Sequence, residues 1–175
     1  MNAKLGRWRR GCGSHRTTRL YEYEKSVVGE IGGNRDNCEP RSCQDTMDHY
    51  TPQQAHETLQ DSPNALLIDC RTEFEFYYIG HPTDAVNIEW NMGTEFDVNP
   101  HFCDQVLKMA GRKDRQIILI CRSGKRSVDA GLALEKFGFT NVSNVLEGFE
   151  GELDREHHRG TLGGWRMRGL PWRQI

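Results

Sequence analysis

The stretch IILICRSGKRS, residues 117–127, is the most informative part of this 175-residue chain. Four large apolar residues lead into Cys121, and six residues without a hydrophobic side chain follow it. An apolar run of this length without polar alternation predicts a strand that is buried on both faces, as in the middle of a parallel sheet. We expect this strand to bring Cys121 to the carboxyl edge of the sheet, where open parallel sheets bind their ligands.

The loop after Cys121 has the composition of an anion-binding loop. Gly124 permits a tight turn in which backbone N–H groups converge on one point. A helix is expected just after the loop, so that the positive end of its dipole lies behind the sulfur. Arg122, Lys125 and Arg126 add positive charge. Because these features favour a thiolate, we interpret Cys121 as a nucleophile; a structural cysteine before an ordinary polar loop is the alternative.

The rest of the chain alternates between strand and helix patterns. Apolar runs predict five strands, at 47–50, 65–69, 85–89, 117–121 and 141–148, and capping and amphipathic patterns predict helices at 51–60, 72–80, 99–111 and 127–138. In the third helix, Phe102, Val106 and Met109 are expected to share one apolar face. The alternation predicts an α/β fold with a five-stranded parallel sheet and helices on both faces.

Composition divides the chain into two parts. Residues 46–150 hold nearly all the apolar runs, whereas residues 1–45 have few. We therefore expect a disordered basic and polar tail over 1–45 and one domain over 46–175, whose C-terminal segment wraps the outside of the core. Residues 1–20 contain six Lys or Arg and no Asp or Glu, which leaves both a targeting segment and a plain basic tail open.

Charge and cysteine usage argue against several classes of protein. A net charge of −2 gives no reason to expect a nucleic-acid or membrane binder, and no apolar run reaches the length of a membrane span. The six cysteines fit no zinc-binding spacing, and we expect neither a metal nor a cofactor. Without a recognisable signal peptide, a reducing cytoplasm is the expected location, with organelle import as the alternative if the basic tail is a targeting segment.

The motifs resemble those of the rhodanese family of sulfurtransferases. CRSGKRS is similar to the family's active-site loop, which commonly reads Cys-Arg-Ser-Gly-x-Arg-Ser. LLIDCRTEFEFYYIGHPTDAVNI, residues 66–88, resembles its upstream Asp-x-Arg, Glu-aromatic, Gly-His and Ala-x-Asn-Ile signature. NVLEGFEG (144–151) and GWRMRGLPW (164–172) resemble its closing strand and its ending. The resemblance covers about residues 46–172 and implies a rhodanese-like fold.

The resemblance implies a two-step sulfur transfer through a persulfide on Cys121. The sulfur would come from thiosulfate or a similar small anion and pass to a thiophilic acceptor, such as cyanide or a thiol; a protein partner in a sulfur relay is a further option. Asp69 and Arg71 are expected to support the loop rather than react. The implied substrate-binding residues are Arg122, Ser123, Gly124, Lys125, Arg126 and Ser127.

Some positions and functions stay open at this point. Cys70 stands where the family usually has an aliphatic residue, so it is either a small core residue or a thiol that resolves Cys121. The extra length between residues 151 and 164 offers a way to shape the mouth of the site, and His81 is expected to make a structural hydrogen bond. A module that only binds a partner, or a sulfur carrier with little activity of its own, is one alternative function.

A cysteine phosphatase is the other alternative function. Its loop also holds a thiolate among backbone N–H groups, but it needs five residues between the cysteine and an arginine that binds phosphate. Only four residues separate Cys121 from Arg126. The shorter loop suits a single sulfur atom better than a phosphate.

Overall fold

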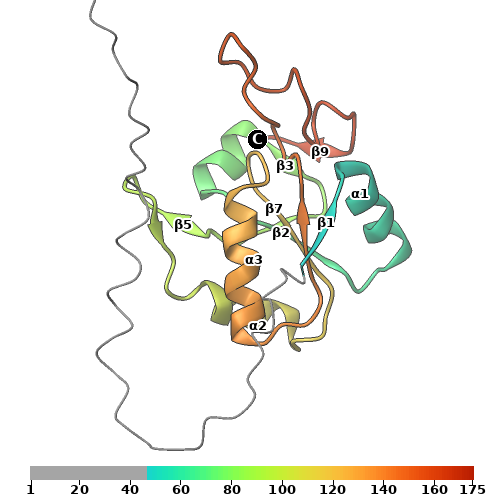
Figure 1. Cartoon of the computed structure of the whole chain (residues 1–175), viewed down its shortest axis with the longest axis vertical. Coiled ribbons are helices and arrows are strands. Elements are labelled where there is room, and N and C mark those ends of the chain that lie inside the picture. The colour runs from blue at the N-terminus through green and yellow to red at the C-terminus, as the bar shows by residue number, and fades with distance from the viewer. Residues whose placement is uncertain (1–46) are drawn as a thin grey trace, which may run out of the picture. The chain divides into compact units, whose positions relative to one another are not determined.

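The computed structural model describes residues 47–175 (Figure 1). The expectations for residues 1–45, a disordered tail or a targeting segment, lie outside the described residues. Within the described part, none of the helices is both long enough and apolar enough to cross a bilayer.

Five strands form one parallel sheet, as expected. They are β1 (Asp48–Tyr50), β2 (Leu66–Asp69), β4 (Val86–Asn87), β7 (Ile117–Ile120) and β8 (Val142–Val145), in the order β1-β8-β7-β2-β4. Every pairing in this sheet is parallel. β7 is the central strand and all four of its residues are fully buried, which confirms the expectation from the apolar run. Strands β4 and β8 are shorter than the runs 85–89 and 141–148 from which they were predicted.

Helices cover both faces of the sheet. They are α1 (Pro52–Asp61), the short π-helical turn η2 (Glu75–Ile79), α2 (Phe102–Ala110) and α3 (Arg126–Phe137). Alternate residues of β7 enter two apolar clusters: Ile117 and Leu119 pack with residues of α2 and α3, while Ile118 and Ile120 pack with residues of α1 and η2. The alternation of side chains along a strand therefore gives each face its own core.

Local capping rules account for the first two helical segments. Thr51 Oγ1 accepts from Gln54 N and Gln54 Oε1 accepts from Thr51 N, which completes the expected capping box of α1. Thr72 and Glu75 exchange the same pair of bonds before η2. Gly80 then ends η2 with a φ of 99°, a backbone conformation that favours glycine.

Helix α2 departs from the expected apolar face. Phe102 and Val106 are buried, but Met109 is 46% exposed, and Ala110 completes the buried stripe instead. The stripe follows a four-residue spacing, so Met109 lies at its edge rather than in its middle. Asn99 does not start the helix; its Oδ1 accepts from His101 N, and α2 begins at Phe102.

The C-terminal segment packs onto the domain and contributes one side chain to its core. Trp165 is 1% exposed and belongs to the cluster on the α1 face, and its Nε1 donates to Pro171 O (2.9 Å). The end of the chain forms β9 (Trp172–Arg173), which pairs antiparallel with β3 (His81–Pro82). In Figure 1 this orange-to-red segment lies at the end of the sheet where α3 begins. A separate hairpin joins β5 (Asn91–Met92) and β6 (Asp97–Val98).

Candidate active site

Cys121 follows the last residue of β7 and is 1% exposed. Its Sγ lies 3.2 Å from Gly124 N, which donates to it, and 3.2 Å from Ser127 Oγ. The loop opens into a pocket of about 250 Å³, lined by Phe96, Cys121, Arg122, Ser123, Lys125, Arg126 and Arg159. Of the residues predicted from CRSGKRS, Gly124 and Ser127 thus contact the Cys121 sulfur, and Arg122, Ser123, Lys125 and Arg126 line the pocket beside it.

Two glycines allow the loop to sit close to the end of β8. Gly124 has a φ of +86°, and a Cβ there would lie 2.1 Å from Leu146 O. Gly148 has a φ of +62°, and a Cβ there would lie 2.5 Å from Cys121 O. The backbone bond from Phe149 N to Cys121 O (2.8 Å) fixes this approach. The loop is therefore built against the backbone of the following strand, where a side chain has no room.

Glu75 binds two of the three cations of the loop. Its carboxylate accepts from both Nη atoms of Arg126 (2.9 and 2.8 Å) and from Arg122 Nε (3.0 Å). Burial by itself raises the pKa of Glu75, but the hydrogen bonds and charge of Arg126, with smaller contributions from Thr72 and Arg122, lower it to about 2. Sequence reasoning noted Glu75 as part of the 66–88 signature but gave it no role in the site.

This cluster gives a pH-dependent contribution to stability. The pKa of Glu75 is about 2 in the folded protein and about 4.5 in the unfolded chain. The cluster therefore stabilises the fold fully above pH ~4.5, and this stabilisation is lost as the pH falls toward 2. The stability difference between wild type and Glu75→Gln is expected to shrink by about 2–3 kcal/mol between pH ~6 and pH ~2.5. Urea unfolding at both pH values measures it, with the exposed Glu57→Gln as control; an unchanged difference would contradict the assignment.

Asp69 and Arg71 form a fully buried ion pair beside the loop. Arg71 Nη2 lies 2.6 Å from Asp69 Oδ2 and donates also to Gly80 O (2.6 Å). The guanidinium stacks 4.4 Å above the ring of Phe149, whose N–H binds Cys121 O. The pair thus connects the end of β2 with the segment that holds the Cys121 loop, which fits the supporting role expected for it.

A hydrogen-bonded chain leads from the sulfur to the far side of β8. Ser127 Oγ donates to Asn144 Oδ1 (2.6 Å), and Asn144 Nδ2 lies 3.2 Å from His49 Nδ1. Ser127 and Asn144 are buried, whereas His49 is exposed. Ser127 faces the sulfur and does not cap α3, whose N-cap residue is Lys125. Sequence reasoning missed Asn144, because a polar residue within a short strand has no local signature.

Cys70 and His81 fit structural roles. Cys70 is fully buried and its Sγ contacts Ile68 O at 3.9 Å. Burial, then the neighbouring Cys121 and Asp69, raises the pKa of the Cys70 thiol well above its ordinary range, which favours an inert core thiol over a resolving one. The His81 ring stacks on Phe76, binds Phe76 O through Nδ1 (2.8 Å) and accepts from Arg173 Nε (3.0 Å) through Nε2.

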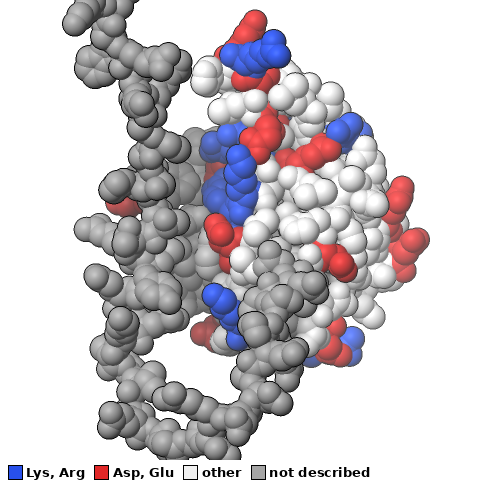
Figure 2. All heavy atoms as spheres, in the orientation of Figure 1, with Lys and Arg blue, Asp and Glu red and all other residues white. Residues whose placement is uncertain are grey.

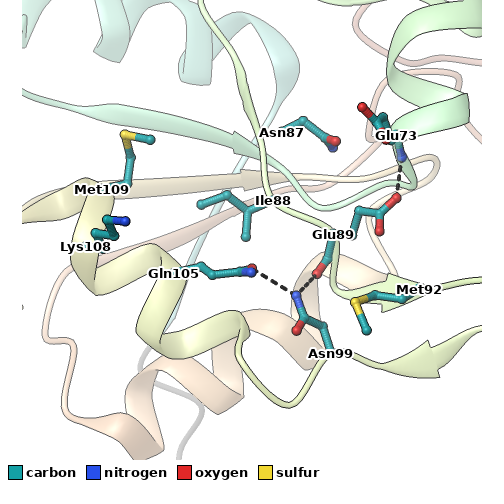
Figure 3. Close-up of a pocket in the computed structure, with 9 residues that line it drawn as sticks. All are labelled: Glu73, Asn87, Ile88, Glu89, Met92, Asn99, Gln105, Lys108 and Met109. Carbon is teal, nitrogen blue, oxygen red and sulfur yellow. Dashed lines mark hydrogen bonds between the residues drawn. The ribbon is translucent and has the colours of Figure 1, made fainter.

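A larger hollow of about 520 Å³ lies elsewhere on the domain (Figure 3) and shares no lining residue with the Cys121 pocket. Asn99 Nδ2 donates to Glu89 O and to Gln105 Oε1, and Glu73 N donates to Glu89 Oε1. Several of its polar groups are thus bound to one another, and none of its lining residues is a cysteine or a histidine. Over residues 47–175, no group of three or more His, Cys, Asp or Glu is placed to hold a metal ion.

Three comparisons relate this chain to known proteins. The family model described as Rhodanese-like domain matches residues 51–152. The crystal structure of Rv0390 from M. tuberculosis is 41% identical with a TM-score of 0.64, over 73% of this chain and 98% of that one. An uncharacterized protein of Rickettsia conorii is 30% identical over 124 residues, 67% of this chain and 90% of that protein. Thiosulfate sulfurtransferase 16 of Arabidopsis thaliana is 34% identical over 106 residues, 59% of this chain and 76% of that protein.

The family match spans more than half of the chain and includes the whole loop from Cys121 to Ser127. The parallel five-stranded sheet with helices on both faces is the architecture that the motifs implied. This chain belongs to the rhodanese-like domain family.

Proposed function

We propose that this protein is a sulfurtransferase that carries sulfane sulfur as a persulfide on Cys121, with thiosulfate or a similar small anion as donor. The family and its thiosulfate sulfurtransferase relatives support a sulfurtransferase type of activity. The observation that carries the specific proposal is the environment of Cys121 Sγ. It receives a backbone N–H at 3.2 Å, has a hydroxyl at 3.2 Å, and opens into a small pocket with arginines along its wall.

The proposed reaction has two steps, each of which forms one bond to the transferred sulfur and breaks another. The Cys121 thiolate attacks the outer sulfur of thiosulfate, a new S–S bond forms, and the old S–S bond breaks so that sulfite leaves with the electron pair. The acceptor, cyanide in an assay or a thiol in a cell, then attacks the outer sulfur of the persulfide. The Cys121–S bond breaks, the thiolate returns, and the product is thiocyanate or a new persulfide. A protein thiol that takes part in a sulfur relay is an acceptor of the same chemistry.

The loop supplies what the persulfide anion needs. Gly124 N–H already points at Sγ and lies at the N-terminal end of α3, where the helix dipole favours negative charge. No acid or base need protonate the leaving sulfite at neutral pH, so the site requires anion stabilisation rather than a catalytic histidine. This demand fits the loop, in which Cys121 Sγ contacts a backbone N–H and a serine hydroxyl.

Thiosulfate treatment is expected to add one sulfur, roughly 32 Da, to the wild-type protein, and cyanide is expected to remove it, because the loop stabilises a sulfur anion. Cys121→Ser is expected to gain nothing, while Cys70 and Cys103 remain in both proteins as internal controls. Intact-mass measurement gives the answer. No adduct on wild type, or an equal adduct on Cys121→Ser, would contradict the proposal.

The arrangement of Arg126 argues against a phosphatase. A cysteine phosphatase binds its substrate through the two forked nitrogens of the loop arginine. Here both Nη atoms of Arg126 are bound by Glu75, at 2.9 and 2.8 Å. Together with the four-residue interval from Cys121, this leaves the loop without the fork that phosphate requires.

A further inference from the structure

The cations of the Cys121 loop are largely compensated by carboxylates. Arg122 and Arg126 bind Glu75, Arg122 Nε also lies 3.6 Å from Glu150, and Lys125 lies 3.1 Å from Glu152. Figure 2 shows this mixture as blue and red side chains next to one another around the N-terminal end of α3. The loop's own cations therefore bring less net positive charge to the pocket than their number implies.

One cation on the wall of the pocket is different. Arg159 comes from the segment 151–164 and lines the pocket together with Cys121 and Phe96. Within the described residues 47–175 it forms no ion pair, and its hydrogen bond there runs from Nη1 to Gly151 O (2.6 Å). It is half-buried, so its charge is only partly screened by water. Within this described part of the chain its other guanidinium N–H groups have no hydrogen-bond partner, so they can bind an anion.

Backbone bonds fix Arg159 relative to the Cys121 loop. Arg122 O accepts from Glu150 N (2.9 Å) and Gly151 N (3.2 Å). Gly160 N donates in turn to Glu150 O (2.8 Å), next to the bond between Arg159 and Gly151 O. Arg122 and Arg159 are thus connected through the backbone of Glu150 and Gly151.

The segment that presents Arg159 is itself organised. Asp154 Oδ1 accepts from Glu156 N (2.9 Å) and His158 N (2.8 Å), and Oδ2 accepts from Thr161 Oγ1 (2.9 Å). These bonds close the turn on both sides of Arg159. An arginine on a hydrogen-bonded turn loses less conformational freedom when it binds a ligand than one on an open loop.

We propose that Arg159 binds the anionic group of the sulfur donor at the mouth of the pocket, and thereby selects anionic donors over neutral ones. The inference rests on the proposed sulfur transfer at Cys121. A pocket of about 250 Å³ suits a small anion whose sulfane sulfur reaches Cys121 Sγ while its charged end binds the guanidinium. The extra segment 151–164 then serves to complete the donor site.

The test compares two alkylating agents of similar size that differ in charge. Iodoacetate and iodoacetamide both alkylate the Cys121 sulfur, forming a carbon–sulfur bond as the carbon–iodine bond breaks and iodide leaves. Only iodoacetate is an anion. For Arg159→Gln the ratio of the two rates, iodoacetate to iodoacetamide, is expected to fall about tenfold, because a charge-assisted contact is lost. Arg155→Gln removes an exposed arginine of the same segment that does not line the pocket, and is expected to keep the ratio.

The iodoacetamide rate reports whether Cys121 itself is intact, so a structural defect and a lost anion site give different results. Arg159→Lys is expected to restore part of the ratio, since it returns the charge without the fork. In the same variants, persulfide formation from thiosulfate should slow in parallel with the iodoacetate rate. If thiosulfate labels neither protein but the ratio still falls, the sulfur-transfer proposal is contradicted and the anion site is supported. An unchanged ratio in Arg159→Gln overturns the inference.

Discussion

Replacement of Asp69 by asparagine is expected to lower the free energy of unfolding by about 3–5 kcal/mol, because it leaves the buried Arg71 guanidinium without its nearest countercharge. Both side chains are fully buried, and Arg71 Nε and Nη2 contact the carboxylate at 2.6 to 3.1 Å. Glu150 does not replace it, since its Oε1 lies 3.8 Å from Arg71 Nη1 and neither atom has a hydrogen-bond partner among residues 47–175.

Urea unfolding of Asp69→Asn beside Asp114→Asn measures the effect. Asp114 pairs with Arg112 at 3.3 Å, but both side chains are about two-thirds exposed, so the same substitution there is expected to cost less than about 1 kcal/mol. A loss of stability at Asp69 as small as at Asp114 would contradict the supporting role. The defect should also reach Cys121, because Arg71 stacks on Phe149, whose N–H binds Cys121 O.

The parts of the fold predicted correctly are those that a few neighbouring residues determine. The unbroken apolar run before Cys121 predicted the buried central strand, and all four residues of β7 are fully buried. The helix predicted at 51–60 starts with the capping box of Thr51 and Gln54, and the helices predicted at 99–111 and 127–138 end at Gly111 and Gly138 in left-handed backbone. Caps and buried strands have local physical causes, so the local sequence is enough.

The parts that escaped prediction depend on pairs far apart in the sequence. Glu75 meets Arg122 and Arg126 across 47 and 51 residues, and the sequence alone showed three cations without their partner. Arg159 lies on the wall of the pocket because turns and backbone bonds bring it there, and no motif marks it. Met109 was placed on the buried face of α2 because it follows Phe102 by seven residues and Val106 follows Phe102 by four. Around the helix axis, the directions of these two side chains differ by only a fraction of a turn.

Gly124→Ala is expected to reduce persulfide formation from thiosulfate at least about a hundredfold, because a shift of about 1 Å at a reacting group has an effect of this size. The added Cβ would lie 2.1 Å from Leu146 O, 2.8 Å from Leu146 C and 2.9 Å from Val145 O. These are backbone atoms, so no flexible side chain can move aside. The loop must move instead, and Gly124 N can no longer donate to Cys121 Sγ at 3.2 Å. Intact-mass measurement after timed exposure to thiosulfate gives the rate.

Gly111→Ala separates the clash from the backbone strain. Gly111 has a φ of +76°, similar to the +86° of Gly124, but a Cβ there would meet no atom within 4 Å. Both variants therefore carry the strain of left-handed backbone, about 1–2 kcal/mol, and only Gly124→Ala carries the clash. We expect Gly111→Ala to be less stable than wild type and to form the persulfide at the wild-type rate. If Gly124→Ala also forms it at that rate, the close fit of the loop against β8 is not what makes Cys121 reactive.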